Sequence, residues 1–381
     1  MKRMRMKEFF NTTYYKSYDL TGLYVTQLIY SLFHKLNINR LLTSGYFSTE
    51  EILFKNNFHE QALKPLDWML RYLVNNKILD SFTKLDRSYF KLVKEPQFLM
   101  NHDLEGIILE HDKRLMSSCE LLKYVSQEYP DFLCGRKSGV DILFCSQKSY
   151  LWRDYFNNNH SGYSVYNHFG AYGFLLWTKH IKRANCLELG CGTGSASLVL
   201  LDSLFKESHP NIINEYILSD ISPIFLRQAS QSLMHQFPDF NDFILKRFDF
   251  NKEFLSQRLM LKSIDIVYSV NALHVAYDLL FTLSEIKKVL KKGGLLIMAE
   301  FIRSVETGTP HHEFIFNLLD SYRLVKIDEK LRKTAGFLTS DAWNKILKKS
   351  GYKDIEIILN SDVDKMGGTP IAGIFKCCVD L

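Results

Sequence analysis

A glycine-rich run after a short apolar segment holds the residue types best suited to bind a small molecule. Residues 185–194 read Asn-Cys-Leu-Glu-Leu-Gly-Cys-Gly-Thr-Gly, with Gly190, Gly192 and Gly194 alternating with larger residues. Glycines at this spacing let the backbone turn sharply and approach a bound molecule where any Cβ would block it. The third glycine comes one residue too early for the loop that binds a pyrophosphate. Glu188 adds to the distinction, because a carboxylate facing the loop would repel a pyrophosphate but suit a cationic amino-acid ligand.

The Glu-x-Gly-x-Gly-x-Gly run resembles the first motif of the class I S-adenosylmethionine-dependent methyltransferases. This resemblance implies a Rossmann-like α/β domain with S-adenosyl-L-methionine as its cofactor. It places Glu188, Gly190, Gly192 and Gly194 among the cofactor-binding residues. The competing interpretation is an ordinary connection from a strand through a turn to a helix.

Polar side chains also stand at the ends of the strands expected after the glycine loop. Asp220 ends the second strand, Asp249 and Phe250 follow the third, and Asn271 follows the fourth. Open α/β sheets bind ligands beyond the carboxyl ends of their strands, so these side chains are expected to line one site. Asp220 would accept both ribose hydroxyls. Asp249 would bind the adenine amino group and Phe250 would stack on its ring, while Asn271 would lie beside the methionine portion.

Two later segments make the resemblance narrower. Residues 271–278 read Asn-Ala-Leu-His-Val-Ala-Tyr-Asp and residues 293–300 read Gly-Gly-Leu-Leu-Ile-Met-Ala-Glu. Both look like the C-methyltransferase domains of polyketide synthases, as does Ser-Asp-Ile-Ser-Pro at 219–223. In that family a histidine after the fourth strand and a glutamate ending the fifth form a catalytic pair. The pair maps here onto His274 and Glu300.

Such a pair suits the removal of a proton from a methyl acceptor. Histidine ordinarily titrates near neutral pH, and a neighbouring carboxylate fixes its tautomer and raises its basicity. The pair would serve C-methylation of a keto or acyl carbon, and equally O-methylation of a phenol or a carboxylate. The alternative for His274 is a structural role in the core or in a helix cap.

A second histidine-containing segment follows the fifth strand, where loops usually meet the substrate. Residues 308–313 read Gly-Thr-Pro-His-His-Glu. With His274 and Glu300, His311 and His312 could provide imidazole and carboxylate ligands for a metal ion, an arrangement that some free-standing C-methyltransferases of α-keto acids resemble. We prefer a substrate-facing loop without a metal, so no metal site is predicted. If a metal were bound, His274, His311 and His312 would be its candidate ligands.

The elements that must position these residues alternate from residue 185 onward. Strands are predicted at 185–188, 215–220, 242–248, 264–270, 295–301, 355–359 and 373–378. Helices are predicted at 195–204, 222–236, 282–291 and 339–350, and Lys-Lys-Gly-Gly at 291–294 is expected to turn the chain into the fifth strand. Alternation is typical of a parallel sheet with crossover helices. The predicted fold is α/β, a Rossmann-like seven-stranded methyltransferase sheet whose last two strands are antiparallel.

The first hundred residues read as helices followed by a small hairpin. Apolar residues recur at helical spacing over 20–42, Ser48 and Glu51 form a capping box, and Pro65 starts another helix. Strand-like pieces follow at 78–82 and 88–92. This order resembles the winged-helix N-terminal domain of many small-molecule methyltransferases, where it supports dimerisation. The predicted domains are a winged-helix-like dimerisation domain at 1–100, a helical linker or lid at 101–181 and a catalytic domain at 182–381.

The same order raises a rival interpretation, a DNA-binding winged helix that uses the cofactor as a ligand. The helix that would read bases carries Trp68, Met69, Leu70, Leu73 and Val74, with only Lys64 and Arg71 as basic residues. A DNA-reading helix presents more basic and amide side chains to phosphates and base edges. No nucleic-acid partner is therefore expected.

The composition is that of a globular chain long enough for two domains. Of 381 residues, 46% are hydrophobic and 24% charged, and the net charge of +6 is spread along the chain. Seven cysteines form no C-x-x-C pair, which argues against a zinc knuckle and fits a reducing cytoplasm. The basic N-terminus lacks the apolar core of a signal peptide. The sequence has no uninterrupted run of about 18 apolar residues, so no membrane span is predicted.

These observations predict a cytoplasmic, homodimeric S-adenosylmethionine-dependent methyltransferase of a small molecule in specialised metabolism. C-methylation of a keto or acyl substrate, free or carrier-bound, is preferred, with O-methylation close behind. A winged-helix regulator is the third alternative. The sequence does not separate these by itself.

Overall fold

The computed structural model describes residues 6–93, 95–97, 102–207, 210–364 and 369–380. The chain forms two compact units. Unit 1 consists of Met1–Asn11, Phe156–Glu306 and Leu324–Leu381, and unit 2 consists of Thr12–Tyr155 and Thr307–Arg323. Residues 307–323 therefore belong to unit 2 although they lie between two segments of unit 1. The functional boundaries expected at residues 100 and 181 stay predictions.

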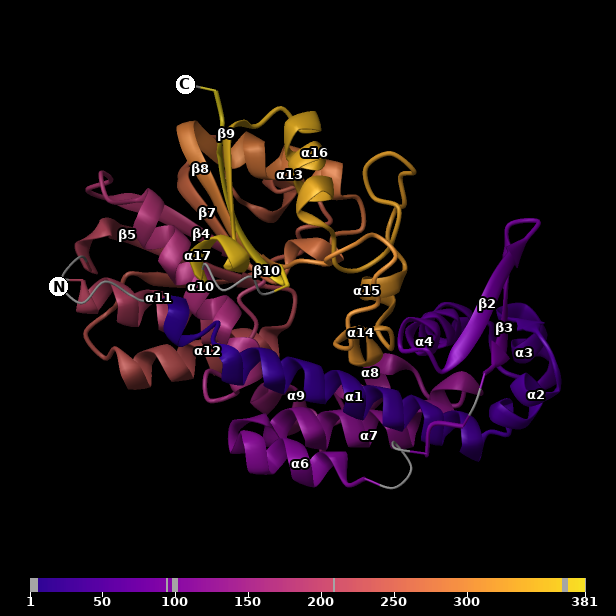
Figure 1. Ribbon diagram of the computed structural model, residues 1–381. Helices are drawn as coiled ribbons and strands as arrows, with labels where there is room; N and C mark the ends of the chain where they lie inside the picture. The colour runs from indigo at the N-terminus through magenta and orange to yellow at the C-terminus, as the bar shows by residue number, and fades with distance from the viewer. Residues whose placement is uncertain (1–5, 94, 98–101, 208–209, 365–368, 381) are drawn as a thin grey trace. The chain divides into compact units, whose positions relative to one another are not determined.

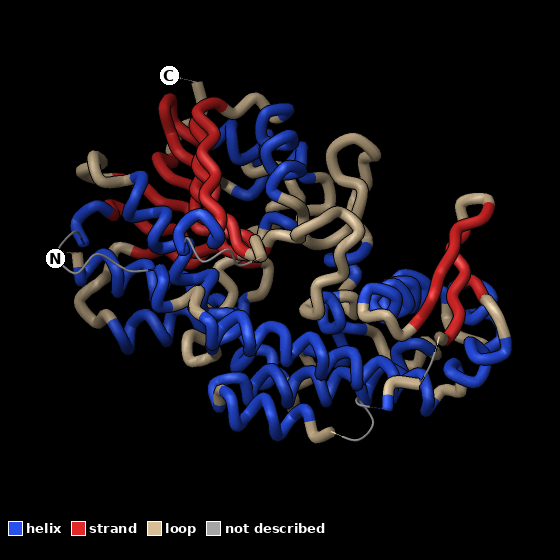
Figure 2. Tube along the Cα trace, in the orientation of Figure 1, coloured by secondary structure: helices blue, strands red, loops and turns tan. Residues whose placement is uncertain are grey.

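A seven-stranded sheet forms the centre of unit 1 (Figures 1 and 2). Its strands are β4 (Ala184–Leu189), β5 (Ile213–Asp220), β6 (Phe243–Arg247), β7 (Ile264–Val270), β8 (Leu290–Phe301), β9 (Lys353–Leu359) and β10 (Ala372–Cys378). They are ordered β6-β5-β4-β7-β8-β10-β9, with β10 antiparallel to both neighbours and the other pairs parallel. The predicted seven-stranded α/β sheet is confirmed.

Alternate residues of these strands enter two separate cores, because successive side chains of a strand point to opposite faces. Cys186 and Tyr268 pack in one core with α10 (Ser161–Trp177), α11 (Ser195–Lys206) and α12 (Pro223–Gln236). Leu187 and Val267 pack in the other with α13 (Leu279–Val289) and α16 (Ser340–Lys349). Since helices cover both faces of the sheet, the carboxyl edge of the parallel strands is the place for a site.

Unit 1 also contains α17 (Asn360–Asp364) and the 3₁₀ turns η1 (Met6–Glu8), η4 (Pro210–Ile212), η5 (Leu255–Gln257) and η6 (Leu273–Val275).

The Lys-Lys-Gly-Gly stretch lies inside β8, so its prediction as a helix end and turn is wrong. Helix α13 ends at Val289 and β8 begins at Leu290. The pairing of β7 with β8 shifts from Ile264–Leu290 to Ile266–Leu295, so β8 accommodates extra residues there. Gly293 has a φ of 71° in this irregularity, a conformation that glycine adopts without steric cost. A strand bulge uses the same glycine chemistry as a turn, which explains the error.

Unit 2 consists of helices and a small three-stranded sheet. Its helices are α1 (Thr12–Lys35), α2 (Ile38–Ser44), α3 (Thr49–Lys55), α4 (Leu63–Asn75), α6 (Leu104–His111), α7 (Met116–Leu133), α8 (Gly139–Leu143), α9 (Ser149–Phe156), α14 (Glu313–Phe316) and α15 (Asp320–Arg323), with 3₁₀ turns η2 (Glu60–Ala62) and η3 (Lys113–Leu115). The single helix predicted over 20–42 is two helices, because Asn37 at a φ of 58° interrupts it. The capping box is confirmed: Glu51 N donates to Ser48 Oγ and Ser48 N to Glu51 Oε2.

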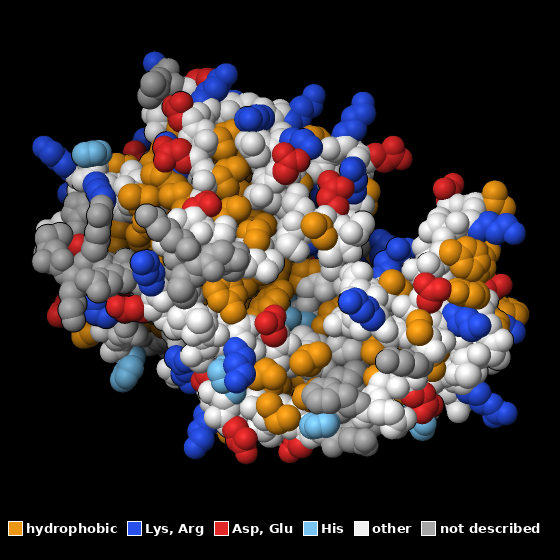
Figure 3. All heavy atoms as spheres, viewed as in Figure 1, with side chains coloured by type: hydrophobic (Ala, Val, Ile, Leu, Met, Phe, Trp, Pro, Cys, Tyr) orange, Lys and Arg blue, Asp and Glu red, His pale blue; other side chains and the backbone are white. Residues whose placement is uncertain are grey.

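The predicted hairpin is present as β2 (Leu79–Lys84) and β3 (Arg87–Leu92), with β1 (Phe47–Ser48) on the other side of β3. Hydrophobic side chains gather on it (Figure 3). Phe82 packs against Tyr46 and Tyr89, with ring centroids 5.0 and 5.2 Å away. Such cross-strand aromatic packing stabilises a short hairpin. Its assignment as the wing of a winged helix stays a prediction.

No helix in the described ranges combines the length and the apolar character that crossing a bilayer requires.

Candidate functional site

The three glycines of the loop after β4 have two kinds of surroundings. A Cβ on Gly190 would lie 2.6 Å from Ala272 Cβ, and one on Gly194 would lie 3.0 Å from Ala229 Cα. Both distances are too short, so these glycines allow close packing. A Cβ on Gly192 would have no protein atom within 4 Å. The loop therefore borders open space at Gly192, where a ligand can approach the backbone.

Asp220 ends β5 and binds the same loop. Its Oδ2 accepts the Gly192 N–H at 3.0 Å and its Oδ1 accepts the Ser222 N–H at 2.8 Å. Burial raises the pKa of the Asp220 carboxyl, while these backbone N–H groups lower it. An ionised carboxylate has about four lone-pair sites, so acceptor capacity remains for a hydroxyl donor such as that of a ribose.

Glu188 is buried between β5 and α11. Ser197 Oγ donates to its Oε2 at 2.6 Å, and the Tyr216 hydroxyl donates to the same oxygen. Burial raises the pKa of the Glu188 carboxyl to about 7, and the two hydroxyl donors oppose that rise. These contacts join two strands and a helix around the start of the glycine loop. A direct contact of Glu188 with a cofactor stays a prediction.

The loop after β6 brings Phe250 to the glycine loop. A Cβ on Gly190 would lie 3.9 Å from Phe250 Cε1, so this ring borders the loop. The Asp249 carboxylate instead has local partners: Oδ1 accepts the Asn251 N–H at 3.0 Å, and Lys252 Nζ lies 3.6 Å from Oδ2. The structure thus places Phe250 at the site, and adenine binding by Asp249 stays a prediction.

Asn271 follows β7 in a left-handed conformation with a φ of 48°. Its N–H donates to Ala299 O at 2.8 Å, and its Oδ1 accepts the Phe301 N–H at 2.6 Å. The buried Nδ2 has no hydrogen-bond partner among the residues that the structure describes. A buried amide donor without a partner is uncommon and favours a bound acceptor at this position.

His274 and Glu300 form the buried pair that the sequence predicted. The distance from His274 Nδ1 to Glu300 Oε2 is 2.7 Å, and the Leu273 N–H donates to Glu300 Oε1 at 3.0 Å. The side chains are 6% and 0% exposed. Turn η6 carries the histidine and β8 carries the glutamate, so both carboxylate oxygens are bound to the turn. The pairing is observed, and its catalytic role stays a prediction.

Two further residues surround His274 that sequence reasoning missed. The Arg332 guanidinium donates to the backbone oxygens of His274 and Ala276, and the ring centroid of Phe337 lies 4.6 Å from that of His274. Both residues lie in a segment without a recognisable motif. No pattern in the sequence connects them with a turn about 60 positions earlier.

His311 and His312 belong to unit 2, whereas His274 and Glu300 belong to unit 1. The two imidazoles stack with centroids 4.1 Å apart, and Tyr18 lies 4.4 Å from His311. Burial lowers the pKa of His311 to about 3. No cluster of three His, Cys, Asp or Glu side chains that could hold a metal occurs in the described part of the chain. The ligand set considered from the sequence draws its members from both units.

Comparisons with known proteins connect the chain with methyltransferases and polyketide synthases. Residues 180–351 match the family model of a methyltransferase domain. A highly reducing polyketide synthase, azaB of Aspergillus niger, is 30% identical over 186 residues, which are 48% of this chain and 7% of the relative. The polyketide synthase PksR of Bacillus subtilis is 25% identical over 259 residues, 66% of this chain and 10% of the relative. The chain thus spans a tenth or less of these curated relatives.

Solved structures share the fold over nearly the whole chain. The DszA carbon methyltransferase has a TM-score of 0.78 at 20% identity, covering 97% of this chain and 91% of its own. The CMeT domain of the citrinin polyketide synthase has a TM-score of 0.75 at 16% identity, covering 98% and 91%. The trans-methyltransferase CalH, solved with S-adenosylhomocysteine, has a TM-score of 0.64 at 17% identity, covering 97% and 92%. The chain therefore contains a methyltransferase domain at residues 180–351 and has the fold of polyketide-synthase carbon methyltransferase domains.

Proposed function

We propose that the chain transfers a methyl group from S-adenosylmethionine to an acidic carbon of a keto or acyl substrate, free or bound to a carrier. The buried His274–Glu300 pair is the observation that carries this proposal. The similarity to proteins named carbon methyltransferases and polyketide synthases supports the choice of carbon as acceptor.

The residues around the glycine loop fit the cofactor. Gly192 borders open space, Asp220 keeps acceptor sites for hydroxyls, the Phe250 ring borders the loop, and Asn271 presents a buried amide donor. In bound S-adenosylmethionine, Asp220 would hold the ribose, Phe250 the adenine and Asn271 the amino-acid portion, while the backbone at Gly192 would lie against the cofactor. S-adenosylmethionine supplies an electrophilic methyl group on a sulfonium, ready for attack by an electron-rich atom.

The His274–Glu300 pair can generate that electron-rich atom. With Glu300 ionised, Nδ1–H of His274 donates to it, which leaves a lone pair on Nε2. Nε2 takes the proton from the carbon beside a carbonyl, and the C–H electron pair becomes an enolate. S-adenosylmethionine, held by the residues around the glycine loop, would supply the methyl group that this carbon takes up and would be left as S-adenosylhomocysteine. Glu300 stabilises the imidazolium until the proton passes to water.

O-methylation is the second candidate function. The same base would remove a proton from a phenol, and an O-methyltransferase family 2 protein from Planctomyces limnophilus shares the fold at a TM-score of 0.51 and 14% identity. Its TM-score is lower than those of the carbon methyltransferases. Carbon therefore remains the preferred acceptor.

Contacts of α4 argue against the DNA-binding alternative. Three of its side chains bind residues 307–323 within unit 2: Lys64 Nζ donates to Arg323 O, Trp68 Nε1 to Glu313 Oε2 and Asn75 Nδ2 to Thr309 Oγ1. These three polar groups of the helix are thus bonded within unit 2. This supports the expectation of no nucleic-acid partner. A homodimer stays part of the proposal, and sedimentation would test it.

The test is methylation of matched acceptors with deuterated S-adenosylmethionine. A β-ketoacyl pantetheine thioester, the same acyl group on a carrier protein, and a phenol would be compared by mass spectrometry. We expect a trideuteromethyl group on carbon of the ketoacyl acceptors, and its loss in His274→Gln while cofactor affinity stays unchanged by calorimetry. Product only on the phenol oxygen would replace the proposal by O-methylation. Salt-sensitive DNA binding without turnover would favour the regulator.

A further inference from the structure

The chain between α15 and α16 runs along the turn that carries His274, and both belong to unit 1. Lys326 N donates to Tyr277 O at 2.8 Å, and Lys326 Nζ lies 2.6 Å from Asp278 Oδ2. Further along, Ile302 and Leu338 form a parallel bridge, and Arg303 N donates to Leu338 O at 3.0 Å. Residues 326–338 are thus bonded at one end to the chain just after η6 and at the other end to the chain just after Glu300.

Arg332 lies at the middle of this segment and is buried, with 3% of its surface exposed. Its Nη1 donates to Ala276 O at 2.7 Å and its Nη2 donates to His274 O. One guanidinium therefore holds the carbonyl of the histidine itself and the carbonyl two residues later. A planar group with several fixed donors can hold two carbonyls at once, which a single ammonium does less well.

The His274 imidazole is then fixed from three sides. Glu300 accepts from Nδ1, Phe337 packs on the ring, and Arg332 fixes the backbone from which the side chain projects. Arg303 Nε in turn donates to Phe337 O at 3.0 Å, which holds that aromatic residue. Glu300 holds the ring through Nδ1 and the first residue of η6 through the Leu273 N–H. Arg332 holds the carbonyl of His274 itself, so a shift of that carbonyl would still displace Nε2.

We propose that Arg332 is a positioning residue that fixes η6 and thereby sets the place of His274 Nε2 for proton removal. This inference rests on the proposed function. Proton transfer requires the base to lie within hydrogen-bond reach of the acidic C–H, and a misplacement of about 1 Å costs on the order of 100-fold in rate. The observed bonds of Arg332 run to the backbone oxygens of His274 and Ala276, so it acts through the backbone of His274.

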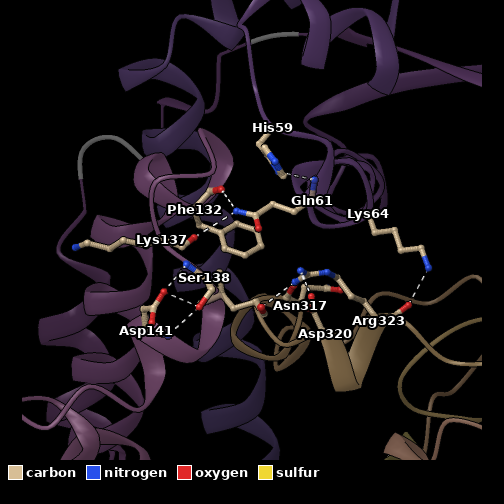
Figure 4. Close-up of polar contacts among 11 residues, drawn as sticks. His59, Gln61, Lys64, Phe132, Lys137, Ser138, Asp141, Asn317, Asp320 and Arg323 are labelled. Atoms are coloured by element: carbon tan, nitrogen blue, oxygen red, sulfur yellow. Dashed lines mark hydrogen bonds and ion pairs between the residues drawn. The ribbon is translucent and has the colours of Figure 1, made fainter.

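Arg323 offers a matched control in unit 2. It is also a buried arginine, and its Nη1 donates to the backbone oxygens of Asn317 at 2.6 Å and Leu318 at 2.8 Å (Figure 4). Its guanidinium carbon also lies 5.1 Å from the Phe132 ring centroid. Arg323→Met removes two bonds to backbone carbonyls, as Arg332→Met does, and in addition an ion pair with Asp320, so it measures at least the general cost of losing a buried guanidinium.

The first experiment compares steady-state kinetics of the full-length variants on the ketoacyl thioester. We expect Arg332→Met to lower kcat about 100-fold and Arg332→Lys about 10-fold, since Lys keeps one donor group. S-adenosylhomocysteine affinity should stay within about twofold in both. Arg323→Met should keep kcat within about threefold even where its melting temperature falls. A folded Arg332→Met with wild-type kcat would overturn the inference. If Arg332→Met does not fold, a wild-type kcat in Arg332→Lys would overturn it.

The second experiment reads the position of His274 without turnover. In protein labelled with ¹⁵N-histidine, the Nδ1–H of His274 bonded to Glu300 gives a low-field signal, assigned by its loss in His274→Gln. We expect that signal to shift or broaden in Arg332→Lys and to stay unchanged in Arg323→Met. An unchanged signal in Arg332→Lys contradicts the positioning role. A shifted signal in a protein that methylates no ketoacyl acceptor would instead refute the proposed function and leave the positioning role standing.

Discussion

The two units each bury histidines, but they surround them with different chemistry. In unit 1 the Glu300 carboxylate lies 2.7 Å from His274 Nδ1. In unit 2 the neighbours of His311 are the rings of Tyr18 and His312, and burial lowers the pKa of His311 to about 3. A carboxylate stabilises the charged imidazolium, whereas aromatic burial destabilises it. Only the first surrounding suits an imidazole that must accept a proton during a reaction.

Acidic residues show the same contrast in their partners. Glu300 accepts from the His274 turn, while Glu313 in unit 2 accepts from Trp68 Nε1 at 2.6 Å and from the Tyr322 hydroxyl at 2.7 Å. The first carboxylate is bound to a group that can gain a proton. The second is bound to donors that hold residues 307–323 in unit 2. This contrast supports the reaction chemistry proposed for Glu300 and a structural role for Glu313.

The largest expected effect separates the two histidines by activity. His274→Gln should lower kcat about 1000-fold because it removes the base, whereas His311→Gln should stay within about threefold. Steady-state methyl transfer to the ketoacyl thioester measures both, with S-adenosylhomocysteine affinity as the control for folding. Equal losses in the two variants would remove the distinction between the sites.

Glu300→Gln tests whether the carboxylate is what distinguishes unit 1. The amide keeps the shape but removes the negative charge that stabilises the imidazolium, so kcat should fall about 100-fold. The matched change Glu313→Gln should leave kcat nearly unchanged and lower the free energy of unfolding by about 1–3 kcal/mol, since it weakens two buried hydrogen bonds. Kinetics and urea unfolding of both variants provide the measurement. A larger kinetic loss in Glu313→Gln would reverse the assignment.

The free energy of unfolding should fall at acidic pH because of His311. Its pKa is lowered to about 3 in the folded protein, so folding releases protons and stability is lost as pH falls below the ordinary histidine value. Between pH 7 and pH 5 the wild type should lose about 2 kcal/mol of unfolding free energy relative to His311→Phe. Urea titrations at the two pH values measure this difference. Parallel pH profiles would show that His311 is solvated.

Glu188 should give unit 1 the opposite dependence on pH. Its folded pKa is raised to about 7 by burial, so its contribution is present at low pH and is lost as pH rises from about 4.5 to about 7. Relative to Glu188→Gln, the wild type should lose about 2 kcal/mol between pH 5 and pH 7. The amide oxygen can still accept from Ser197 and Tyr216, so packing is retained. No change in the difference between the two proteins would place the Glu188 pKa near its ordinary value.

Local patterns made much of the site predictable. Strand ends could be located because short apolar strand segments alternate with helical segments. Parallel strands then bring Glu188, Asp220 and Asn271 to one edge of the sheet. The His274–Glu300 pair could be proposed from the resemblance to polyketide-synthase C-methyltransferase domains, and the pairing of β7 with β8 brings the ends of these strands together. Errors came where one residue type serves several structures, as at Gly293, which forms a strand irregularity instead of a turn.

The amino-acid sequence alone determined the α/β sheet, the glycine loop and the residues that follow each strand, because these depend on short-range periodicity and turn chemistry. Only the tertiary structure decided that Arg332 holds the His274 turn and that His311 belongs to unit 2. Both depend on contacts between segments far apart in the chain. Nothing local records such contacts, since a buried arginine and an exposed one have the same neighbours in sequence.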